Sequence, residues 1–270
     1  MRECSVKQMH LDWIEDSKKP IFFCSFGKDS SVVLHGIMPW IEKIMVVFVD
    51  CGGTFPDIVE WAKKEGAKMP HFMIVNGPGN IWDDIAAKGW SVDVEIADLG
   101  RHSNLMMRED VARRHKVRPW TECTMERFWI PAYAFSEMYR PDLFISGEKA
   151  MDRPYATDWG NRTHGAPRAI RPIFDWTDEE VWEYIDYHGI QLPKTFQERQ
   201  PDRRDCFLCF GHGLTVGRVR YLRENYPELF EKIFYERGFA EVVPVMVRQL
   251  TEIRAVWAEV EKMLEEPWQH

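Results

Sequence analysis

Long apolar runs and an excess of positive charge are both missing from this sequence of 270 residues. No apolar stretch approaches the roughly 20 residues that a membrane-spanning helix needs, so we expect no membrane association. The formal net charge is −8, which excludes a sequence-independent nucleic-acid coat, because such a coat needs many cations to neutralise phosphates. The opening residues MRECSVKQMH lack the pattern of a signal peptide. A cytoplasmic protein is therefore expected.

Cysteines are also few, six in all, and in the cytoplasm thiols, metal ligands or catalysts are expected rather than disulfides. The sequence has no internal repeat and no low-complexity tract. It has neither a Walker A loop nor the Gly-x-Gly-x-x-Gly of dinucleotide folds. What it does have is length and 45% hydrophobic residues, enough to bury a substantial core in one large domain or in a domain with an appendage.

Apolar runs alternate with helical patterns through the first two thirds of the chain. The runs show no polar alternation and cover residues 21–26, 44–50, 71–75 and 142–147. The segments between them, such as PDIVEWAKKEGA, have the 3.6-residue spacing of amphipathic helices. Buried strands separated by helices predict an α/β fold, a parallel sheet with helices on both faces.

A change of pattern near residue 206 predicts the domain organisation. The charged stretch from about Pro193 to Cys209 has little periodicity and is interpreted as a loop, and the residues after it are helical to near the end. We therefore expect an α/β domain over residues 1–205. A helical C-terminal extension over residues 206–270 would begin at the Cys-x-x-Cys pair.

The segment FFCSFGKDSS, residues 22–31, predicts an anion site. An apolar strand ends in a turn that contains Gly27, and a helix is expected to start at Ser30. Backbone N–H groups at such a helix start, together with the helix dipole, favour bound phosphate. Lys28 adds a cation, and Asp29 beside phosphates suggests an intervening magnesium ion. The alternative is an ordinary capped helix with a solvated Lys–Asp pair.

This loop, SFGKDS, resembles the Ser-Gly-Gly-Lys-Asp-Ser loop of the N-type ATP pyrophosphatases, and specifically of the phosphoadenosine-phosphosulfate (PAPS) reductase-like family, which are adenine nucleotide alpha hydrolase-like PP-loop proteins. Three further stretches resemble family motifs in the same order. They are VFVDCGGTFPD (47–57), FISGEKAMDR (144–153) and RPIFDWTDEEVWEYI (171–185). The resemblance covers roughly residues 18–210.

The resemblance implies that ATP and Mg²⁺ bind at the strand ends, with Lys28 and Asp29 as the catalytic residues. It implies attack by a substrate oxygen on the α-phosphate with loss of pyrophosphate, catalysed by positioning and by positive charge. The residues implied in nucleotide binding are Ser25, Gly27, Lys28, Asp29, Ser30, Asp50, Gly52, Thr54, Gly147 and Lys149.

The sequence departs from the family pattern at several positions. Phe26 replaces a loop glycine, Cys51 replaces a threonine, and Lys149 stands where the family usually has arginine. Neither Phe26 nor Cys51 removes a backbone donor. An arginine expected beyond Gly147 has no clear match, and the substitutes we consider are Arg162 and Arg168. We interpret Asp175 as the cap of the helix that starts near Thr177.

The segment CFLCFGH places two cysteines at metal-ligand spacing, and soft thiolates suit zinc or iron–sulfur. The family resemblance adds Cys123, at the place where iron–sulfur members have a cysteine pair. Three interpretations stay open: a four-iron four-sulfur cluster, a zinc ion, or reduced thiols without metal. The ligands predicted for a shared site are Cys123, Cys206, Cys209 and His212. We expect Cys24 to be a core residue.

The function predicted is ATP-dependent adenylation with pyrophosphate release, combined with sulfur transfer if the cluster is present. One alternative is PAPS reductase itself, although the sequence has no cysteine after Cys209 to match the mobile C-terminal cysteine of those enzymes. Another alternative is a non-catalytic nucleotide-binding partner subunit. The acceptor, a nucleic acid or a small molecule, is not specified by the sequence, and we expect either a homo-oligomer or a partner subunit.

Overall fold

The computed structural model describes residues 8–92, 117–152, 168–197, 199, 206–209 and 216–244. Among these residues, no helix combines the length and the apolarity needed to cross a membrane. Contacts divide the chain into two compact units. The first unit comprises residues 1–78 and 125–207, and the second comprises residues 79–124 and 208–270. The second unit thus joins an internal segment to the C-terminal residues, which the sequence did not lead us to expect.

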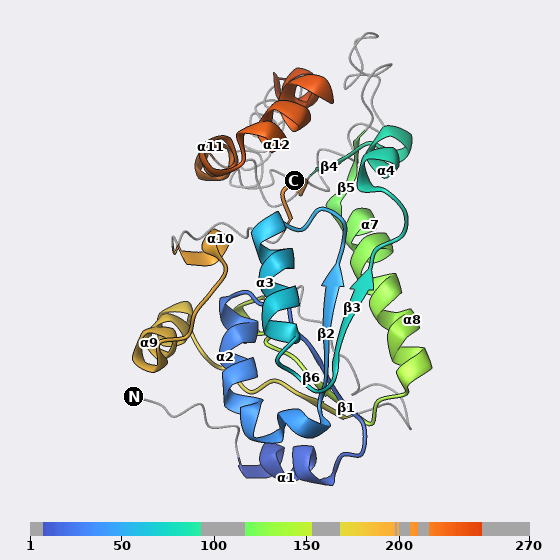
Figure 1. The fold of residues 1–270 in the computed structure, drawn as a ribbon. Coiled ribbons are helices and arrows are strands. Elements are labelled where there is room, and N and C mark those ends of the chain that lie inside the picture. Colours follow the sequence, from blue (N-terminus) through green and yellow to red (C-terminus); the bar gives the residue numbers. More distant parts are fainter. Residues whose placement is uncertain are drawn as a thin grey trace, which may run out of the picture. The chain divides into compact units, whose positions relative to one another are not determined.

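A five-stranded parallel sheet forms the centre of the first unit (Figure 1). Its strand order is β3-β2-β1-β6-β7. The strands are β1 (Pro20–Phe23), β2 (Met45–Asp50), β3 (Phe72–Asn76), β6 (Leu143–Ile145) and β7 (Arg168–Ile170). The chain builds one half of the sheet outward from β1 and then returns to build the other half, so the strand order reverses at β1. Ligands of open α/β sheets bind at the carboxyl ends of strands beside such a reversal.

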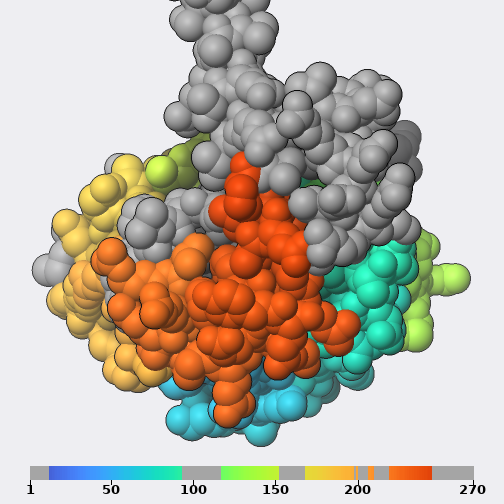
Figure 2. Space-filling model, turned by 90° about the horizontal axis from the view of Figure 1, so that it is seen from above, coloured from blue at the N-terminus to red at the C-terminus, as the bar shows by residue number. Residues whose placement is uncertain are grey.

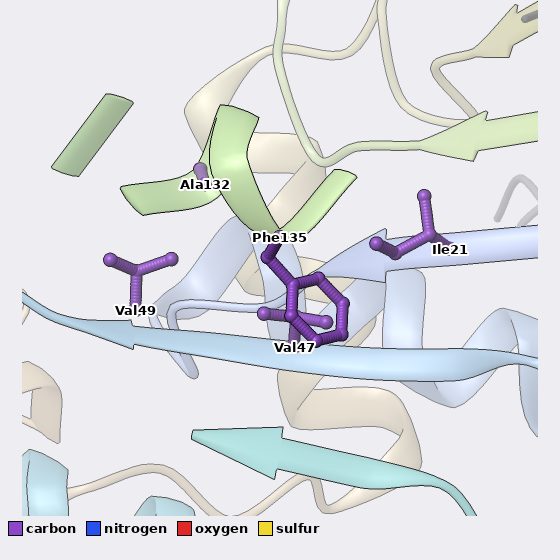
Figure 3. Close-up of a cluster of buried hydrophobic side chains, with 5 residues drawn as sticks. All are labelled: Ile21, Val47, Val49, Ala132 and Phe135. Carbon is purple, nitrogen blue, oxygen red and sulfur yellow. The ribbon is translucent and has the colours of Figure 1, made fainter. Parts of the chain in front are cut away.

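Helices cover both faces of this sheet, which confirms the predicted α/β class (Figure 1). On one face α8 packs against β1 and β2, where Ala132 and Phe135 meet Ile21, Val47 and Val49 in a buried cluster (Figure 3). The elements of this unit outside the sheet are α1 (Gln8–Asp16), α2 (Lys28–Ile37), η1 (Met38–Lys43), α3 (Pro56–Gly66), η3 (Met125–Trp129, a π-helix), α8 (Ile130–Tyr139), η4 (Ala150–Asp152), α9 (Asp178–His188) and α10 (Lys194–Gln197).

Two helix starts differ from the sequence prediction. Helix α2 begins at Lys28, two residues before Ser30. Helix α9 is capped by Thr177 and not by Asp175: the Thr177 hydroxyl accepts from the Glu180 N–H at 3.2 Å, and the Glu180 carboxylate accepts from the Thr177 N–H at 2.8 Å. This reciprocal pair is a capping box, which satisfies two N–H groups at once.

The second unit contains a short two-stranded parallel sheet and small helices. Trp90 is buried there against Phe239, with ring centroids 4.8 Å apart. Helices α11 and α12 pack together and form one continuous orange surface in Figure 2, which confirms helical structure near the C-terminus. The elements of this unit are α4 (Ile81–Lys88), β4 (Trp90–Val92), β5 (Val117–Pro119), α7 (Trp120–Thr124), α11 (Val216–Asn225), α12 (Pro227–Glu231) and η5 (Lys232–Glu236).

Asp142 ties the start of β6 to the segment before β1, and removing its carboxylate should destabilise the sheet. It accepts hydrogen bonds from the Ser17 hydroxyl and from the N–H groups of Lys18 and Lys19, at 2.8 and 2.9 Å for the latter two. We expect Asp142→Ala to lower the free energy of unfolding by about 1.5–3 kcal/mol, the scale of charged hydrogen bonds. Denaturant unfolding measures this, with the exposed Asp12→Ala as control.

The pH dependence of that loss has a definite sign. Burial raises the pKa of Asp142, but the hydrogen bonds from Ser17, Lys18 and Lys19 outweigh burial and hold the pKa below its ordinary 3.8. The carboxylate therefore stabilises the fold above the unfolded-state pKa, and this contribution is lost as the pH falls through the folded-state value. The gap between wild type and Asp142→Ala should stay constant from pH 7 to about 5 and shrink below about 4. A gap that widens in acid would contradict this assignment.

Candidate functional site

The loop between β1 and α2 has a strained residue at its centre. Phe26 has φ 57°, in the left-handed region that favours glycine, which is the residue found here in the resembled loops. The ring of Phe26 is 1% exposed and packs against Phe48 and Phe72, with centroids 6.0 and 6.2 Å away. Burial of this ring offsets a conformational strain of about 1–3 kcal/mol. The loop thus uses its central side chain as part of the core.

The start of α2 has the features of an anion site. Its N-cap is Gly27, which has no side chain to accept hydrogen bonds from the first helical turn. The hydroxyls of Ser25 and Ser30 lie 3.2 Å apart, and the Gly27 N–H points to the Ser25 hydroxyl at 3.3 Å. The predicted loop residues therefore do come together at the carboxyl edge of the sheet.

Short helix α10 lies against this loop. The ring of Phe196 comes within 3.5 Å of the position that a Cβ on Gly27 would occupy. The helix is fixed there by Asp57 at the start of α3, whose carboxylate accepts from the Thr195 N–H at 2.8 Å and from its hydroxyl at 2.6 Å. Asp57, the acidic residue of the FPD sequence, thus fixes helix α10 beside the β1–α2 loop.

Two lysines and two aspartates form an ion-pair network beside the loop. The Lys28 ammonium lies 2.9 Å from Asp29 Oδ1 and 2.6 Å from Asp178 Oδ1. The Lys149 ammonium lies 2.7 Å from Asp29 Oδ1 and also bonds Asp178. Lys28, Asp29 and Lys149 were expected here, whereas the sequence analysis missed Asp178, the first residue of α9. The signal available in the sequence was the position of Asp178 in the DWTDEE segment, where a helix starts.

Lys149 is the buried member of this network, whereas the other three side chains are partly exposed. Lys149 is 1% exposed, and although its burial lowers the pKa, Asp29 and Asp178 raise the pKa above the ordinary value. Burial raises the pKa of Asp178, but its bonds to Lys149 and Lys28 outweigh this and leave the pKa lowered. Lys149 and Asp178 thus carry opposite charges at neutral pH and stabilise each other. Lys28 is consequently paired with carboxylates in this state, not a solvated cation.

Gly147, at the end of β6, allows a close approach between that strand and α2. A Cβ at this position would lie 3.1 Å from the Ser30 nitrogen and 3.2 Å from the Asp29 carbonyl carbon, both rigid backbone atoms. Any larger residue would push the loop helix away from the sheet. The neighbour that explains the glycine is therefore the backbone of α2, and contact between Gly147 and a nucleotide stays a prediction.

The turn after β2 is held by its own side chains. The Asp50 carboxylate accepts from the Gly52 N–H at 2.9 Å, and Gly52 has φ 80°, which suits glycine. The Cys51 thiol lies 3.5 Å from the Thr54 hydroxyl. Thr54 forms an antiparallel bridge with Cys206. These predicted nucleotide-binding residues lie together at the carboxyl end of β2, as expected, and their part in binding remains a prediction.

Arg127 was missed by the sequence analysis, because one arginine in an amphipathic run carries no distinctive signal. It is 2% exposed. Its Nε donates to the Cys51 carbonyl at 2.6 Å and its guanidinium donates to the Pro78 carbonyl at 2.8 Å. Arg127 therefore fixes the turn after β2 to the segment that follows β3.

Replacing Arg127 by methionine should show how much this link contributes. Methionine keeps much of the side-chain volume but leaves two carbonyls without this donor, so we expect unfolding to become easier by about 2–4 kcal/mol, at roughly 1–3 kcal/mol for each unsatisfied group. Denaturant unfolding gives the value, and Arg127→Lys should recover part of it. A loss below about 0.5 kcal/mol, the usual range of surface changes, would show that the link is not needed.

The cysteines differ sharply in environment. Cys24 follows β1 and is 2% exposed, and its burial raises the pKa to about 12, which confirms the expected core position. The Cys51 thiol is hydrogen-bonded to the Cys206 side chain, which lowers the pKa of Cys51 to about 7 despite burial. The two thiols are thus neighbours in the first unit, and the sequence analysis assigned Cys51 no such role.

The predicted metal ligands divide between the two units. Cys206 belongs to the first unit, while Cys123 and Cys209 belong to the second. Within the residues that the structure describes, no three histidine, cysteine, aspartate or glutamate side chains gather as metal ligands. His212 lies outside the described residues, so the shared site stays a prediction.

Arg168 is a wrong candidate for the missing arginine. It is the first residue of β7, paired in register with Leu143 at the start of β6, so it lies at the amino edge of a parallel sheet. Its guanidinium stacks over Trp13, 5.2 Å from the ring centroid. The loop and the ion-pair network occupy the opposite, carboxyl edge. The other candidate, Arg162, falls outside the described residues.

Several known proteins are similar to this chain in sequence. A PAPS reductase of Xylella fastidiosa (strain M12) is 25% identical over 173 residues, 63% of this chain and 64% of that protein. A sulfate adenylyltransferase subunit 2 of Shewanella sediminis is 23% identical over 207 residues, 69% of this chain and 64% of that protein. The chain therefore spans just under two thirds of the length of these relatives.

Solved structures are also similar. The structural match to the U34-tRNA thiolase NcsA of Methanococcus maripaludis, solved with its [4Fe-4S] cluster, covers 85% of this chain and 74% of the thiolase chain. The TM-score is 0.42 and the sequence identity is 15%. The phosphoadenosine phosphosulfate reductase domain family matches residues 19–202, a span that begins just before β1 and includes the loop, the ion-pair network and α9. Because that match covers well over half of the chain, the protein belongs to the phosphoadenosine phosphosulfate reductase domain family.

Proposed function

We propose that this protein binds ATP with Mg²⁺ at the β1–α2 loop and transfers the adenylyl group to an acceptor oxygen, releasing pyrophosphate. The observation that supports this most is the network of Lys28, Asp29, Lys149 and Asp178 beside the N-terminus of α2. Two cations and two carboxylates next to a helix start provide both phosphate donors and oxygen ligands for a hard cation.

Each group has a distinct part in this proposal. The first-turn N–H groups of α2 and the Lys28 ammonium bind the phosphate oxygens that gain charge as pyrophosphate leaves. Asp29 and Asp178 supply carboxylate oxygens, the ligand type that Mg²⁺ prefers, so the residues present fit this ion. When bound, the ion would neutralise phosphate charge. Lys149 holds the two carboxylates in place from the buried side.

A sulfur-transfer step would use the cysteines. Cys206 and Cys209 supply soft thiolates at the spacing that suits zinc or an iron–sulfur cluster, with Cys123 as the third predicted thiol. A cluster, when bound, would supply redox or sulfur-carrying chemistry. The protein's own contribution is to hold these thiolates and to admit the acceptor, which is a nucleic acid or a small molecule.

Two other functions are kept because relatives favour them. The match to PAPS reductases supports reduction of a sulfonucleotide bound by the same loop. The match to a sulfate adenylyltransferase subunit supports a nucleotide-binding chain that works with a partner subunit. Both would bind a nucleotide at the same loop, and they differ in the chemical step after binding.

Parallel assays separate the three functions. Calorimetry with ATP–Mg²⁺ and with PAPS tests binding, and pyrophosphate release with candidate acceptors tests adenylation. Sulfite production with thioredoxin tests the reductase, and we expect none. Sulfite production at about one turnover per second or faster would show that the protein is a reductase and would refute the proposed adenylation. Tight ATP binding without pyrophosphate, in all acceptor screens, would favour the partner subunit.

A further inference from the structure

Two thiols from distant parts of the chain lie side by side in the first unit. Cys51 directly follows β2, and Cys206 comes more than 150 positions later, yet the Cys51 thiol is hydrogen-bonded to the Cys206 side chain. Both residues are half-buried, whereas the core residue Cys24 is 2% exposed. The pair therefore combines contact between two sulfurs with partial exposure to solvent, and the proposed adenylation does not use it.

The backbone around the two thiols holds them together. Thr54 and Cys206 form an antiparallel bridge, and the Phe207 N–H donates to the Gly53 carbonyl at 2.8 Å. The buried rings of Phe55 and Phe207 pack with their centroids 5.8 Å apart. All of these residues belong to the first unit. The contact between the thiols thus rests on paired backbone and buried rings within one compact unit.

We propose that Cys51 and Cys206 form a reversible disulfide when the protein meets a hydroperoxide, which makes the turn after β2 an oxidation-sensitive site. A partly exposed thiol with a second thiol beside it is the arrangement of redox-sensing cysteines, because the second sulfur captures the first once it is oxidised. The bridge would fasten the turn after β2 covalently to the segment at Cys206 and Phe207. A metal ion on Cys206 would occupy that thiolate, so the disulfide belongs to the metal-free protein.

The reaction uses one hydroperoxide for each disulfide. One thiolate of the pair attacks an oxygen of the hydroperoxide, the O–O bond breaks, and an alcohol, or water from hydrogen peroxide, leaves a sulfenic acid behind. The other thiol attacks that sulfur, so that the S–S bond forms, the S–O bond breaks and water leaves. The two thiols together lose two electrons and two protons, which the hydroperoxide takes up. A dithiol reductant reverses the change by thiol–disulfide exchange.

The experiment uses the full chain, stripped of metal with a chelator and treated with hydrogen peroxide. Remaining thiols are alkylated, and the chain is digested with trypsin, which should release Cys51 in the peptide 44–63 and Cys206 together with Cys209 in the peptide 205–218. Mass spectrometry should find these two peptides joined, with the loss of two hydrogens, and dithiothreitol should separate them. On a non-reducing gel the oxidised chain should stay a monomer.

Two matched variants assign the sulfur on the second peptide. Cys209→Ser should keep the cross-link, whereas in Cys206→Ser the cross-linked fraction should fall at least about tenfold, because the sulfur beside Cys51 is gone. Melting curves show whether each variant folds. Fragmentation of the cross-linked peptides from wild type identifies the bonded sulfur directly, so the assignment holds even if a variant is unstable.

Four outcomes would overturn the proposal. The first is a Cys206–Cys209 bridge within one peptide, with Cys51 alkylated. The second is a cross-link that persists in Cys206→Ser, and the third is a cross-link between two chains. The last is oxidation of Cys51 to the sulfinic or sulfonic acid without any cross-link, since a neighbouring thiol should intercept the sulfenic acid first. ATP binding, measured separately by calorimetry, tests the proposed function and leaves this inference unaffected.

Discussion

Lys28→Ala is expected to weaken ATP–Mg²⁺ binding by about 1–3 kcal/mol, the scale of a lost charged hydrogen bond, which corresponds to roughly 5- to 150-fold in Kd. The structure gives a second reason for a large effect. Lys28 also neutralises Asp29 and Asp178, so its removal leaves the site with one lysine against two carboxylates. A net negative site repels phosphate. Calorimetry with ATP in the presence and absence of Mg²⁺ measures both contributions.

The matched control is Lys63→Ala, an exposed lysine in the last turn of α3. It removes the same charge from the protein without touching the loop, so any loss that it shows reflects net charge alone. Binding of a sulfonucleotide should fall together with that of ATP in Lys28→Ala. Unchanged affinity for both nucleotides in that variant would refute the loop assignment.

Lys149→Met should have the largest effect on the fold and on the site together. Breaking a fully buried ion pair costs about 3–5 kcal/mol, and because the partners Asp29 and Asp178 are partly exposed we expect about 2–4 kcal/mol here. Methionine fills a similar volume, so the loss comes from the charge and not from a cavity. The variant should also weaken ATP binding, because both carboxylates lose the group that orients them.

Lys149→Arg is the conservative comparison, since the resembled family usually has arginine at this position. Arginine keeps the charge and should retain most of the nucleotide affinity. Urea unfolding, together with calorimetry, separates the two effects of Lys149→Met. If Lys149→Met unfolds like wild type and binds ATP normally, the ion-pair network has neither the stabilising role nor the nucleotide-binding role given to it here.

Sequence alone determined the features that depend on neighbouring residues. Apolar runs without polar alternation predicted a parallel sheet, because strands covered on both faces must be apolar throughout. The strand–glycine–helix pattern at residues 22–31 predicted a turn and a helix start after β1, because these are local structures, and phosphate binding there stays a prediction. Even the error at Asp175 was avoidable, since Thr177 and Glu180 carry the spacing of a capping box. Helix α2 begins two residues before the predicted Ser30, which is about half a helical turn.

Only the tertiary structure decided which distant residues meet. Asp178 joins Lys28 because α9 packs beside α2, and Lys149 enters the same network because β6 pairs with β1. The register of β7 against β6 places Arg168 at the amino edge of the sheet, opposite the loop that it was expected to serve. Cys51 meets Cys206 through a bridge between segments that no periodicity relates. Such contacts depend on the order of the strands and on the packing of helices over the sheet, which local spacing does not encode.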